Sequence, residues 1–208
     1  MVQESVLREK KTEKSHIHCA ALTPEEAYVC LVDVGTDEIL VYAADSLELV
    51  DTVKFPEGSG PRHIVFSSKG SYAYVITESS SEVFLMAYTP EQERKLVILG
   101  SNSTEPVGFG GAAGIRISPG ERFVLASNRN ADSISVFQIR ENGWLRLVYN
   151  EIVPCGCPRD FQFTPDGKWV IAGLQTTDRL AVYKFNENGT MEQVSFVDEI
   201  ERPTCIVF

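Results

Sequence analysis

The stretch PRHIVFSSKGSYAYVITESSSEVFLMAY, residues 61–88, contains the structural pattern of the whole chain. A short apolar strand leads into a polar turn, and a second strand rich in β-branched and aromatic residues follows. A polar loop then leads to a third strand. Because helical periodicity is scarce along the sequence, the pattern predicts an all-β protein.

The same pattern occurs in four segments. The other three are HIHCAALTPEEAYVCLVDVGTDEILVY from residue 16, AAGIRISPGERFVLASNRNADSISVF from residue 112 and PRDFQFTPDGKWVIAGLQTTDRLAVY from residue 158. Their turns align at Pro24, Ser68, Pro119 and Pro165, so the successive intervals are 44, 51 and 46 residues, a period typical of β-propeller blades. A weaker fourth strand, such as LRLVYNEIV from residue 145, follows each segment. The sequence therefore predicts a β-propeller of four-stranded antiparallel blades, of which four are present.

The two ends of the chain differ from the repeat. Residues 202–208, RPTCIVF, match the first strand of another blade. We expect a closing strand there, because a strand without its blade leaves an unpaired edge. Residues 1–14 form a polar segment, and residues 15–208 form the propeller domain.

The composition argues against several classes of function. The formal net charge is −10 and the isoelectric point is about 4.8, which disfavours binding to nucleic acid or to an anionic membrane surface. No apolar run approaches the roughly 20 residues of a transmembrane helix. The charged N-terminus lacks the apolar core of a signal peptide. A cytoplasmic location is therefore expected.

The cysteines indicate neither a disulfide framework nor a metal site. Cys19, Cys30, Cys155, Cys157 and Cys205 are an odd set in a chain too large to need covalent cross-links, so free thiols in a reducing compartment are expected. The pair in CGC is too close for the redox pattern with two intervening residues. No second pair at zinc-finger spacing accompanies it, and no metal site is predicted.

Polar residues recur where the repeat places one end of a channel. In a propeller the first strand of each blade lines the channel and the second runs antiparallel to it, so the start of one and the end of the other lie at the same mouth. The core positions of the repeat agree, whereas these positions diverge into reactive side chains. Six residues before the turns lie His18, Arg62, Ala113 and Arg159, and ten residues after them lie Val34, Glu78, Arg129 and Gln175.

The charges at this mouth predict an anionic ligand. Removing an arginine from water costs several kcal/mol unless a partner compensates it. Three arginines around Glu78 leave positive charge over, which a carboxylate or phosphate would satisfy with paired hydrogen bonds. The alternative is that Arg62 and Glu78 form only a structural ion pair between strands.

Other polar residues have simpler interpretations. His63 follows Arg62, so it is expected on the opposite face of the strand as a core or supporting residue. His16 shares the parity of His18 and is a candidate substrate-binding residue. An aspartate at the start of the third strand is expected to be structural, bonding loop amides as an Asx turn. It recurs as Asp37, Asp132 and Asp178.

Seven short motifs, taken together, resemble one family. They are SHIH from residue 15, DVGTD at 33–37, GPRH ending at residue 63, TE ending at 78, SNR ending at 129, DSI from 132 and PRDF from 158. In this order they resemble the lactonase family of seven-bladed propellers, which includes the propeller-type 6-phosphogluconolactonases. The resemblance covers residues 11–208 and implies an N-terminally truncated member, with four of seven blades. Residues 1–14 would then be the remnant of an earlier blade and residues 15–208 a partial propeller domain. An incomplete ring would expose blade edges and apolar faces, which predicts self-association.

The resemblance also implies site residues. The fungal cis,cis-muconate lactonizing enzyme has the same fold and a functional set of a histidine, two arginines and a glutamate. By resemblance these are His18, Arg62, Glu78 and Arg129, the expected catalytic residues. A TE dipeptide replaces the more usual Asn-Glu and keeps the carboxylate. The expected substrate-binding residues are His16, Arg159 and Gln175.

The implied activity is hydrolysis of a sugar-acid lactone, 6-phosphogluconolactone to 6-phosphogluconate in the pentose phosphate pathway, without a metal or an organic cofactor. Glu78 or His18 would act as general base. Arg62 and Arg129 would hold the substrate and stabilise the developing oxyanion, and Arg159 could bind the phosphate. Two alternatives remain: a lactonizing or isomerising enzyme acting on an unsaturated dicarboxylate such as muconate, and a non-catalytic propeller fragment or interaction platform.

Overall fold

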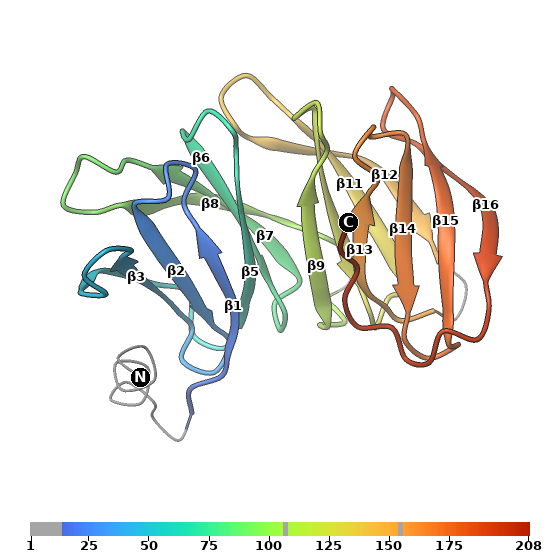
Figure 1. Ribbon diagram of the computed structural model, residues 1–208, viewed down its shortest axis with the longest axis horizontal. Helices are drawn as coiled ribbons and strands as arrows, with labels where there is room; N and C mark the ends of the chain where they lie inside the picture. The colour runs from blue at the N-terminus through green and yellow to red at the C-terminus, as the bar shows by residue number, and fades with distance from the viewer. Residues whose placement is uncertain (1–13, 106–107, 154–155) are drawn as a thin grey trace.

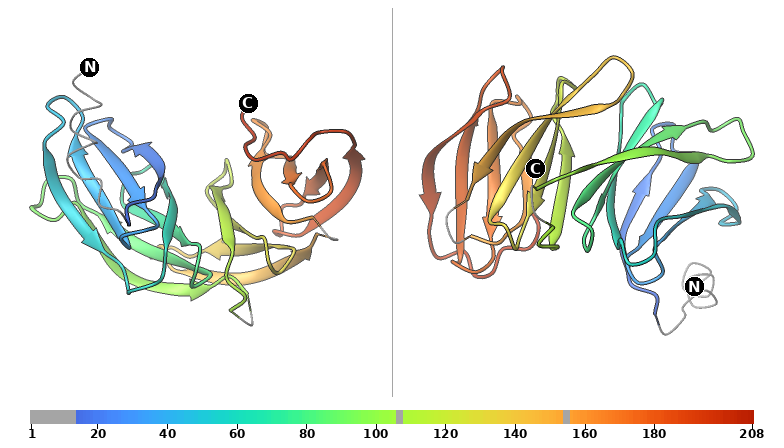
Figure 2. Two further views of the ribbon diagram at one scale, coloured as in Figure 1. Left: turned by 90° about the horizontal axis from the view of Figure 1, so that it is seen from below. Right: turned by 180° about the vertical axis from the view of Figure 1, so that it is seen from behind.

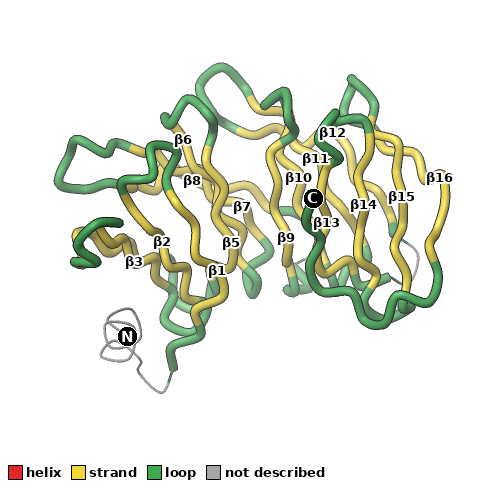
Figure 3. Tube along the Cα trace, in the orientation of Figure 1, coloured by secondary structure: helices red, strands yellow, loops and turns green. Residues whose placement is uncertain are grey.

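The protein is all-β, as the sequence predicts. The computed structural model describes residues 14–105, 108–153 and 156–208, and within these ranges it contains strands, turns and loops but no helix (Figure 3). Consequently none of the described ranges offers a helix that could span a membrane. The proposed blade remnant at residues 1–14 falls almost entirely outside the described residues, as does Cys155. The other four cysteines are free thiols.

The described strands form four sheets, each a four-stranded antiparallel meander in chain order (Figure 1). The first blade comprises β1 (Ile17–Leu22), β2 (Tyr28–Asp33), β3 (Glu38–Ala43) and β4 (Leu49–Lys54), and the second comprises β5 (Pro61–Phe66), β6 (Tyr72–Thr77), β7 (Glu82–Tyr88) and β8 (Leu96–Ser103). The third comprises β9 (Ala112–Ile117), β10 (Phe123–Asn128), β11 (Ser133–Ile139) and β12 (Leu145–Ile152), and the fourth comprises β13 (Pro158–Phe163), β14 (Trp169–Leu174), β15 (Arg179–Phe185) and β16 (Met191–Val197).

The four blades follow one another along an open arc, which is clearest in the left view of Figure 2. The first strands of successive blades, β1, β5, β9 and β13, are neighbours along the arc. They therefore occupy the inner position that the sequence assigned to the first strand of each blade.

Three apolar layers lie between successive blades, and a smaller apolar cluster of Leu31, Leu40 and Tyr42 lies on the first blade. Strand β6 shows why the layers form, because its side chains alternate between two of them. Val75 packs toward the first blade, whereas Tyr74 and Ile76 pack toward the third. A strand that is buried on both faces reads as an almost continuous apolar run, which explains the sequence YAYVIT.

Every inner strand carries a β-bulge near its start. The register against the second strand slips between Ile17 and Cys19, between Pro61 and His63, and between Pro158 and Asp160. In the third blade the slip on β10 lies between Ala126 and Asn128, which pair with Ile115 and Ala112. The residues at the bulges are those that the repeat aligned six positions before each turn: His18, Arg62, Ala113 (with Gly114) and Arg159.

The recurring aspartates bond amides, as expected, but not those of their own turn. Asp37 accepts hydrogen bonds from the amides of Gly58 (2.8 Å) and Gly60 (2.7 Å), in the linker to the next blade. Asp132 and Asp178 accept from the amides of Cys157 (2.7 Å) and Arg202 (2.9 Å). Asp37 and Asp132 therefore connect successive blades, and Asp178 connects the fourth blade to the C-terminal segment, instead of closing a local Asx turn.

The C-terminal segment does not form the closing strand that the sequence predicts. Residues 198–208 contain no strand, and isolated backbone amides of this segment, besides that of Arg202, attach it to the fourth blade. The amide of Ile200 donates to the carbonyl of Asp178 (3.0 Å), and that of Ile206 donates to Asp160 Oδ2 (2.9 Å). The motif for an inner strand is present, but a strand forms only where a second strand pairs with it.

Candidate functional site

The bulges bring side chains from separate blades to one end of the inner strands. A bulge inserts one residue and redirects its side chain, which is why bulges occur often beside active sites. The ends of the second strands reach the same place. Their first following residues donate backbone hydrogen bonds to the residues just before β1, β5, β9 and β13: Val34 to His16 (3.0 Å), Glu78 to Gly60 (2.6 Å), Arg129 to Gly111 (3.0 Å) and Gln175 to Cys157 (3.3 Å). Within each blade, the end of the second strand therefore lies beside the start of the first, as the sequence predicts.

Glu78 lies between two guanidinium groups. Its Oε2 accepts from Arg62 Nε at 2.8 Å, and its Oε1 pairs with Arg129 Nη2 at 2.9 Å. The arginines are held in turn by carbonyls of the third blade: Arg62 Nη1 donates to Ala113 O (2.7 Å) and Arg129 Nε to Gly111 O (3.0 Å). The ion pair between Arg62 and Glu78, which the structural alternative proposed, exists, but it is one half of an arrangement that joins two blades.

The electrostatics of this cluster keep Glu78 ionised. Burial by itself raises the pKa of its carboxyl, but the hydrogen bonds and charges of Arg129 and Arg62 outweigh that effect and hold the pKa below its usual value. Arg62 is 2% exposed. Its burial lowers its pKa to about 10, against the opposing charge of Glu78, so the guanidinium remains charged at neutral pH.

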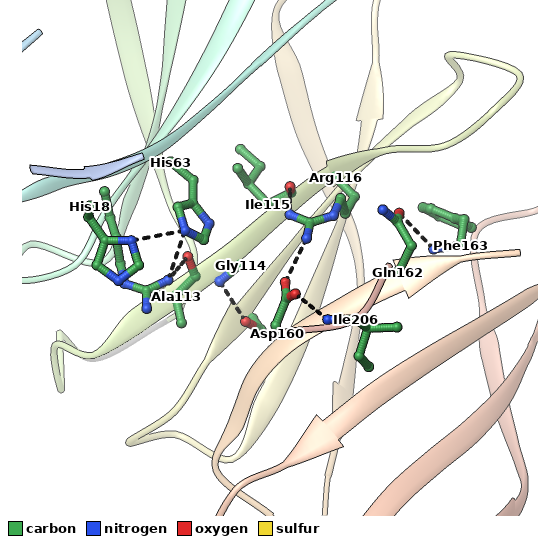
Figure 4. A network of polar contacts seen from close by, with 12 residues as sticks. His18, His63, Ala113, Gly114, Ile115, Arg116, Asp160, Gln162, Phe163 and Ile206 are labelled. Atoms are coloured by element: carbon green, nitrogen blue, oxygen red, sulfur yellow. Dashed lines mark hydrogen bonds and ion pairs between the residues drawn. The ribbon is translucent and has the colours of Figure 1, made fainter. Parts of the chain in front are cut away.

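Two histidines lie in contact beside the arginine. His18 Nδ1 is 3.1 Å from His63 Nε2 (Figure 4). His63 Nε2 is also 3.5 Å from Arg62 Nη1. The expectation that His63 faces away from Arg62 is wrong, because the bulge at Arg62 breaks the alternation of the strand. Burial, followed by the charge of Arg62, lowers the pKa of His63 to about 2 and that of His18 to about 4. Both rings are therefore neutral at neutral pH.

These residues adjoin a cavity of about 430 Å³, a size that suits a small molecule. Five of the seven predicted site residues line this cavity. The other two, Arg62 and Gln175, do not. Arg62 lies buried beneath Glu78. The lining residues are His16, Ile17, His18, Val34, Glu78, Arg129 and Arg159.

The cavity carries an excess of positive charge in a chain whose net charge is −10. Arg129 and the buried Arg62 share the single charge of Glu78. Arg159 makes no ion pair or hydrogen bond with any part of the chain that the structure describes, so its guanidinium is available to a ligand. Within the same described ranges, no group of three or more histidine, cysteine or acidic residues could hold a metal ion.

A larger cavity of about 640 Å³ lies at the turns of the second and third blades, where Lys69 and Arg140 alternate with Glu121 and Glu141. The charged side chains at this cavity are of both signs, and they do not form a buried cluster of the kind that lies beside the smaller cavity. We therefore assign the functional site to the smaller cavity.

Sequence reasoning did not identify several contributors to the site. Ile17 lines the cavity, and the carbonyls of Gly111 and Ala113 orient the arginines. The glycine pair in FGGAAG, residues 109–114, indicates a special backbone conformation at Gly111. Gly111 has a φ of +82°, and a Cβ there would lie 2.8 Å from the side chain of Asn130, so only glycine fits.

The fold and the site define a propeller with a cationic cavity at the channel mouth. The family model described as "Lactonase, 7-bladed beta-propeller" matches residues 2–208, and the chain belongs to this family.

Individual relatives agree with that assignment. A 6-phosphogluconolactonase of Bacillus subtilis is 35% identical over 159 residues, which cover 74% of this chain and 46% of the relative. Two solved structures are also similar. A putative 6-phosphogluconolactonase of Bacteroides fragilis has a TM-score of 0.83 at 28% identity, covering 94% of this chain and 59% of its own. A periplasmic gluconolactonase of Pseudomonas aeruginosa has a TM-score of 0.84 at 30% identity, covering 92% and 56%. The chain spans about half the length of the curated relatives it matches.

Proposed function

We propose that the cavity binds and hydrolyses a sugar-acid lactone, with 6-phosphogluconolactone as the substrate and 6-phosphogluconate as the product, a step of the pentose phosphate pathway in the cytoplasm. The observation that carries the proposal is the cationic cavity in which an ionised Glu78, a neutral His18 and an unpaired Arg159 meet. The lactonases among the relatives support the lactone as the reacting group.

The residues suggest a division of roles. Arg159 would bind the phosphate or another anionic end of the substrate, because its guanidinium offers paired donors. Arg129 lines the cavity and would stabilise the negative charge that develops on the carbonyl oxygen during attack by water. Arg62 is buried, so we assign it to positioning Glu78 instead of to contact with the substrate. A neutral His18 or the carboxylate of Glu78 would accept the proton of the attacking water.

The proposal is tested by measuring lactone hydrolysis above the spontaneous rate. The wild type should accelerate hydrolysis of 6-phosphogluconolactone, and H18A should lower kcat by at least about 100-fold, the usual contribution of a general base. R159Q should raise KM for the phosphorylated lactone more than for gluconolactone. R146Q is a matched control, because Arg146 is exposed and its side chain hydrogen-bonds to Gln138 on the outer strands, away from the cavity.

Three results would contradict the proposal. A wild type that leaves both lactones at the rate in buffer would remove the lactonase activity. Turnover of a muconate-like dicarboxylate by that same protein would favour the lactonizing alternative. Full biological function with His18, Glu78 and Arg129 all replaced by alanine would favour the non-catalytic platform.

A further inference from the structure

Three nitrogen atoms form a chain that runs from a buried charge to the cavity. Arg62 Nη1 lies 3.5 Å from His63 Nε2, and His63 Nε2 lies 3.1 Å from His18 Nδ1. Figure 4 shows the two rings with the linking contact between them. Because a neutral imidazole has one nitrogen that donates and one that accepts, this chain determines where the protons of both rings lie.

The guanidinium of Arg62 determines which ring nitrogen of His63 carries the proton. Arg62 can only donate hydrogen bonds and remains charged, and its Nη1 also donates to Ala113 O at 2.7 Å. A lone pair on His63 Nε2 faces this cation favourably, whereas an N–H there would meet like partial charge. His63 therefore carries its proton on Nδ1. That atom is buried without a hydrogen-bond partner among the described residues in either tautomer, so the contact of Nε2 with Arg62 is the interaction that distinguishes the two tautomers.

The second proton follows from the first. Since His63 Nε2 accepts, His18 Nδ1 must donate to it across the 3.1 Å contact. A neutral His18 then has its lone pair on Nε2. His18 lines the cavity, and no described residue makes a hydrogen bond to its Nε2.

We propose that His63 is a positioning residue that holds His18 in the Nδ1–H tautomer and so makes His18 Nε2 the general base of the site. The assignment of a base rests on the proposed lactone hydrolysis, whereas the tautomer does not. The proposed tautomer also favours His18 over Glu78 as the general base. Both oxygens of Glu78 already accept hydrogen bonds from charged donors, which weakens the carboxylate as a base, whereas His18 Nε2 is open.

The step balances without a further reactant. The oxygen of water bonds to the lactone carbonyl carbon while its proton moves to His18 Nε2, and the imidazolium keeps its Nδ1–H bond to His63. The ring C–O bond of the tetrahedral intermediate then breaks, and the leaving oxygen takes the proton back from Nε2. The carboxylic acid so formed ionises in solvent, and His18 returns to its starting tautomer.

The tautomer can be observed directly by ¹⁵N NMR of the imidazole nitrogens, because the chain has only three histidines. At pH 7 we expect a protonated Nδ1 and an unprotonated Nε2 for His18. H63Q supplies an amide oxygen that can accept from both Arg62 and His18, so it should keep this tautomer. H63F cannot accept, so His18 should sample both tautomers. The charged groups that face the two rings are Arg62 and Glu78 of the second blade, Arg116 of the third and Arg159 of the fourth.

Kinetics provide the second readout. H63F should lower kcat at least about 10-fold with little change in KM, and H63Q should restore most of it. A His18 that is protonated on Nε2 in the wild type would overturn the proposal whatever the activity. The predicted tautomer in a protein that hydrolyses no lactone would instead refute the proposed function and leave the positioning role of His63 intact. Equal losses of kcat in H63F and H63Q, with the tautomer unchanged in both, would show that His63 is only structural.

Discussion

At the scale of the residue, the side chain inserted at each bulge decides what that blade contributes to the site. The repeat places His18, Arg62, Ala113 and Arg159 at equivalent points, and each performs a different task. Ala113 contributes its carbonyl, which accepts from Arg62 at 2.7 Å. A longer side chain is unnecessary there, because the guanidinium of the second blade already reaches across to the third.

The neutral histidine pair predicts a pH dependence of stability. In the folded protein the pKa of His63 is about 2, whereas an unfolded histidine titrates near 6.5. The unfolded state therefore binds an extra proton as pH falls below 6.5, so this contribution to stability is fully present above pH 6.5 and is lost on acidification, by at most about 1.4 kcal/mol per pH unit. Urea unfolding between pH 7 and 5 should show a shallower fall in the free energy of unfolding for H63Q than for the wild type. Parallel curves would contradict the assignment of a neutral, buried His63.

Glu26 occupies a turn position that favours glycine. The equivalent residues of two other blades are Gly70 and Gly167, and all have positive φ, which is 60° for Glu26. A residue with a Cβ is destabilised by about 1–2 kcal/mol in this region of φ. Glycine avoids this strain, but its more flexible unfolded state offsets part of the gain in stability. E26G should therefore raise the free energy of unfolding by about 0.5 kcal/mol. E26A, which removes the charge but keeps the Cβ, is the control, and an equal gain in E26A would attribute the effect to charge.

At the scale of the element, the linkers from the first blade to the second and from the third to the fourth each bond to one carboxylate. Asp37 illustrates this, because it has a φ of 56° at the turn before β3 and bonds two amides of the linker that leads into β5. Its backbone carbonyl accepts a further hydrogen bond, from the amide of Phe55 at 2.9 Å. One residue thus sets where the next inner strand, and with it Arg62, begins.

Replacement of Asp37 separates its carboxylate from its backbone conformation. D37G keeps the positive φ and removes both accepted bonds, so it should lower the free energy of unfolding by about 2 kcal/mol, the usual scale for hydrogen bonds to a charged group. D37N keeps one acceptor oxygen and tolerates the same φ, so about half the loss is expected. Denaturant titration measures both. A D37G variant as stable as the wild type would show that the linker holds its course without the carboxylate.

At the scale of the whole molecule, the arc makes the blades unequal. The second and third blades have an apolar layer on each side, whereas the first and fourth each share one such layer with a neighbouring blade. In an array of repeats that contact only their neighbours, stability is roughly the sum of the repeats and their interfaces. The outer blades of this chain should therefore open first.

Hydrogen exchange followed by mass spectrometry tests this inequality. Amides of β6 and β10 should exchange more slowly than those of β2 and β14, because opening a central blade disrupts two layers and opening an outer blade disrupts one. Peptides from the four second strands are matched controls for each other, since they hold equivalent positions. Uniform protection in all four would mean that the arc opens only as a single cooperative unit.

Much of this architecture could be predicted from the sequence, because it depends on local patterns that recur. The turn signals and the period of the repeat placed all sixteen strands, and antiparallel pairing brought Glu78 and Arg129 to the mouth that holds His18. The failures share a cause. His63 and the segment 202–208 were assigned from strand patterns, but a bulge redirected the first and the second had no strand with which to pair.

The sequence by itself determined the all-β blades, their order and the residue types that gather at one end of the inner strands, since alternation and turn chemistry are properties of neighbouring residues. Only the tertiary structure decided that Glu78 is shared by two arginines, that Arg62 is buried while Arg159 is unpaired, and that His63 contacts His18. These depend on how separate blades pack, because ion pairs and pKa values are set by groups that are distant along the chain and close in space.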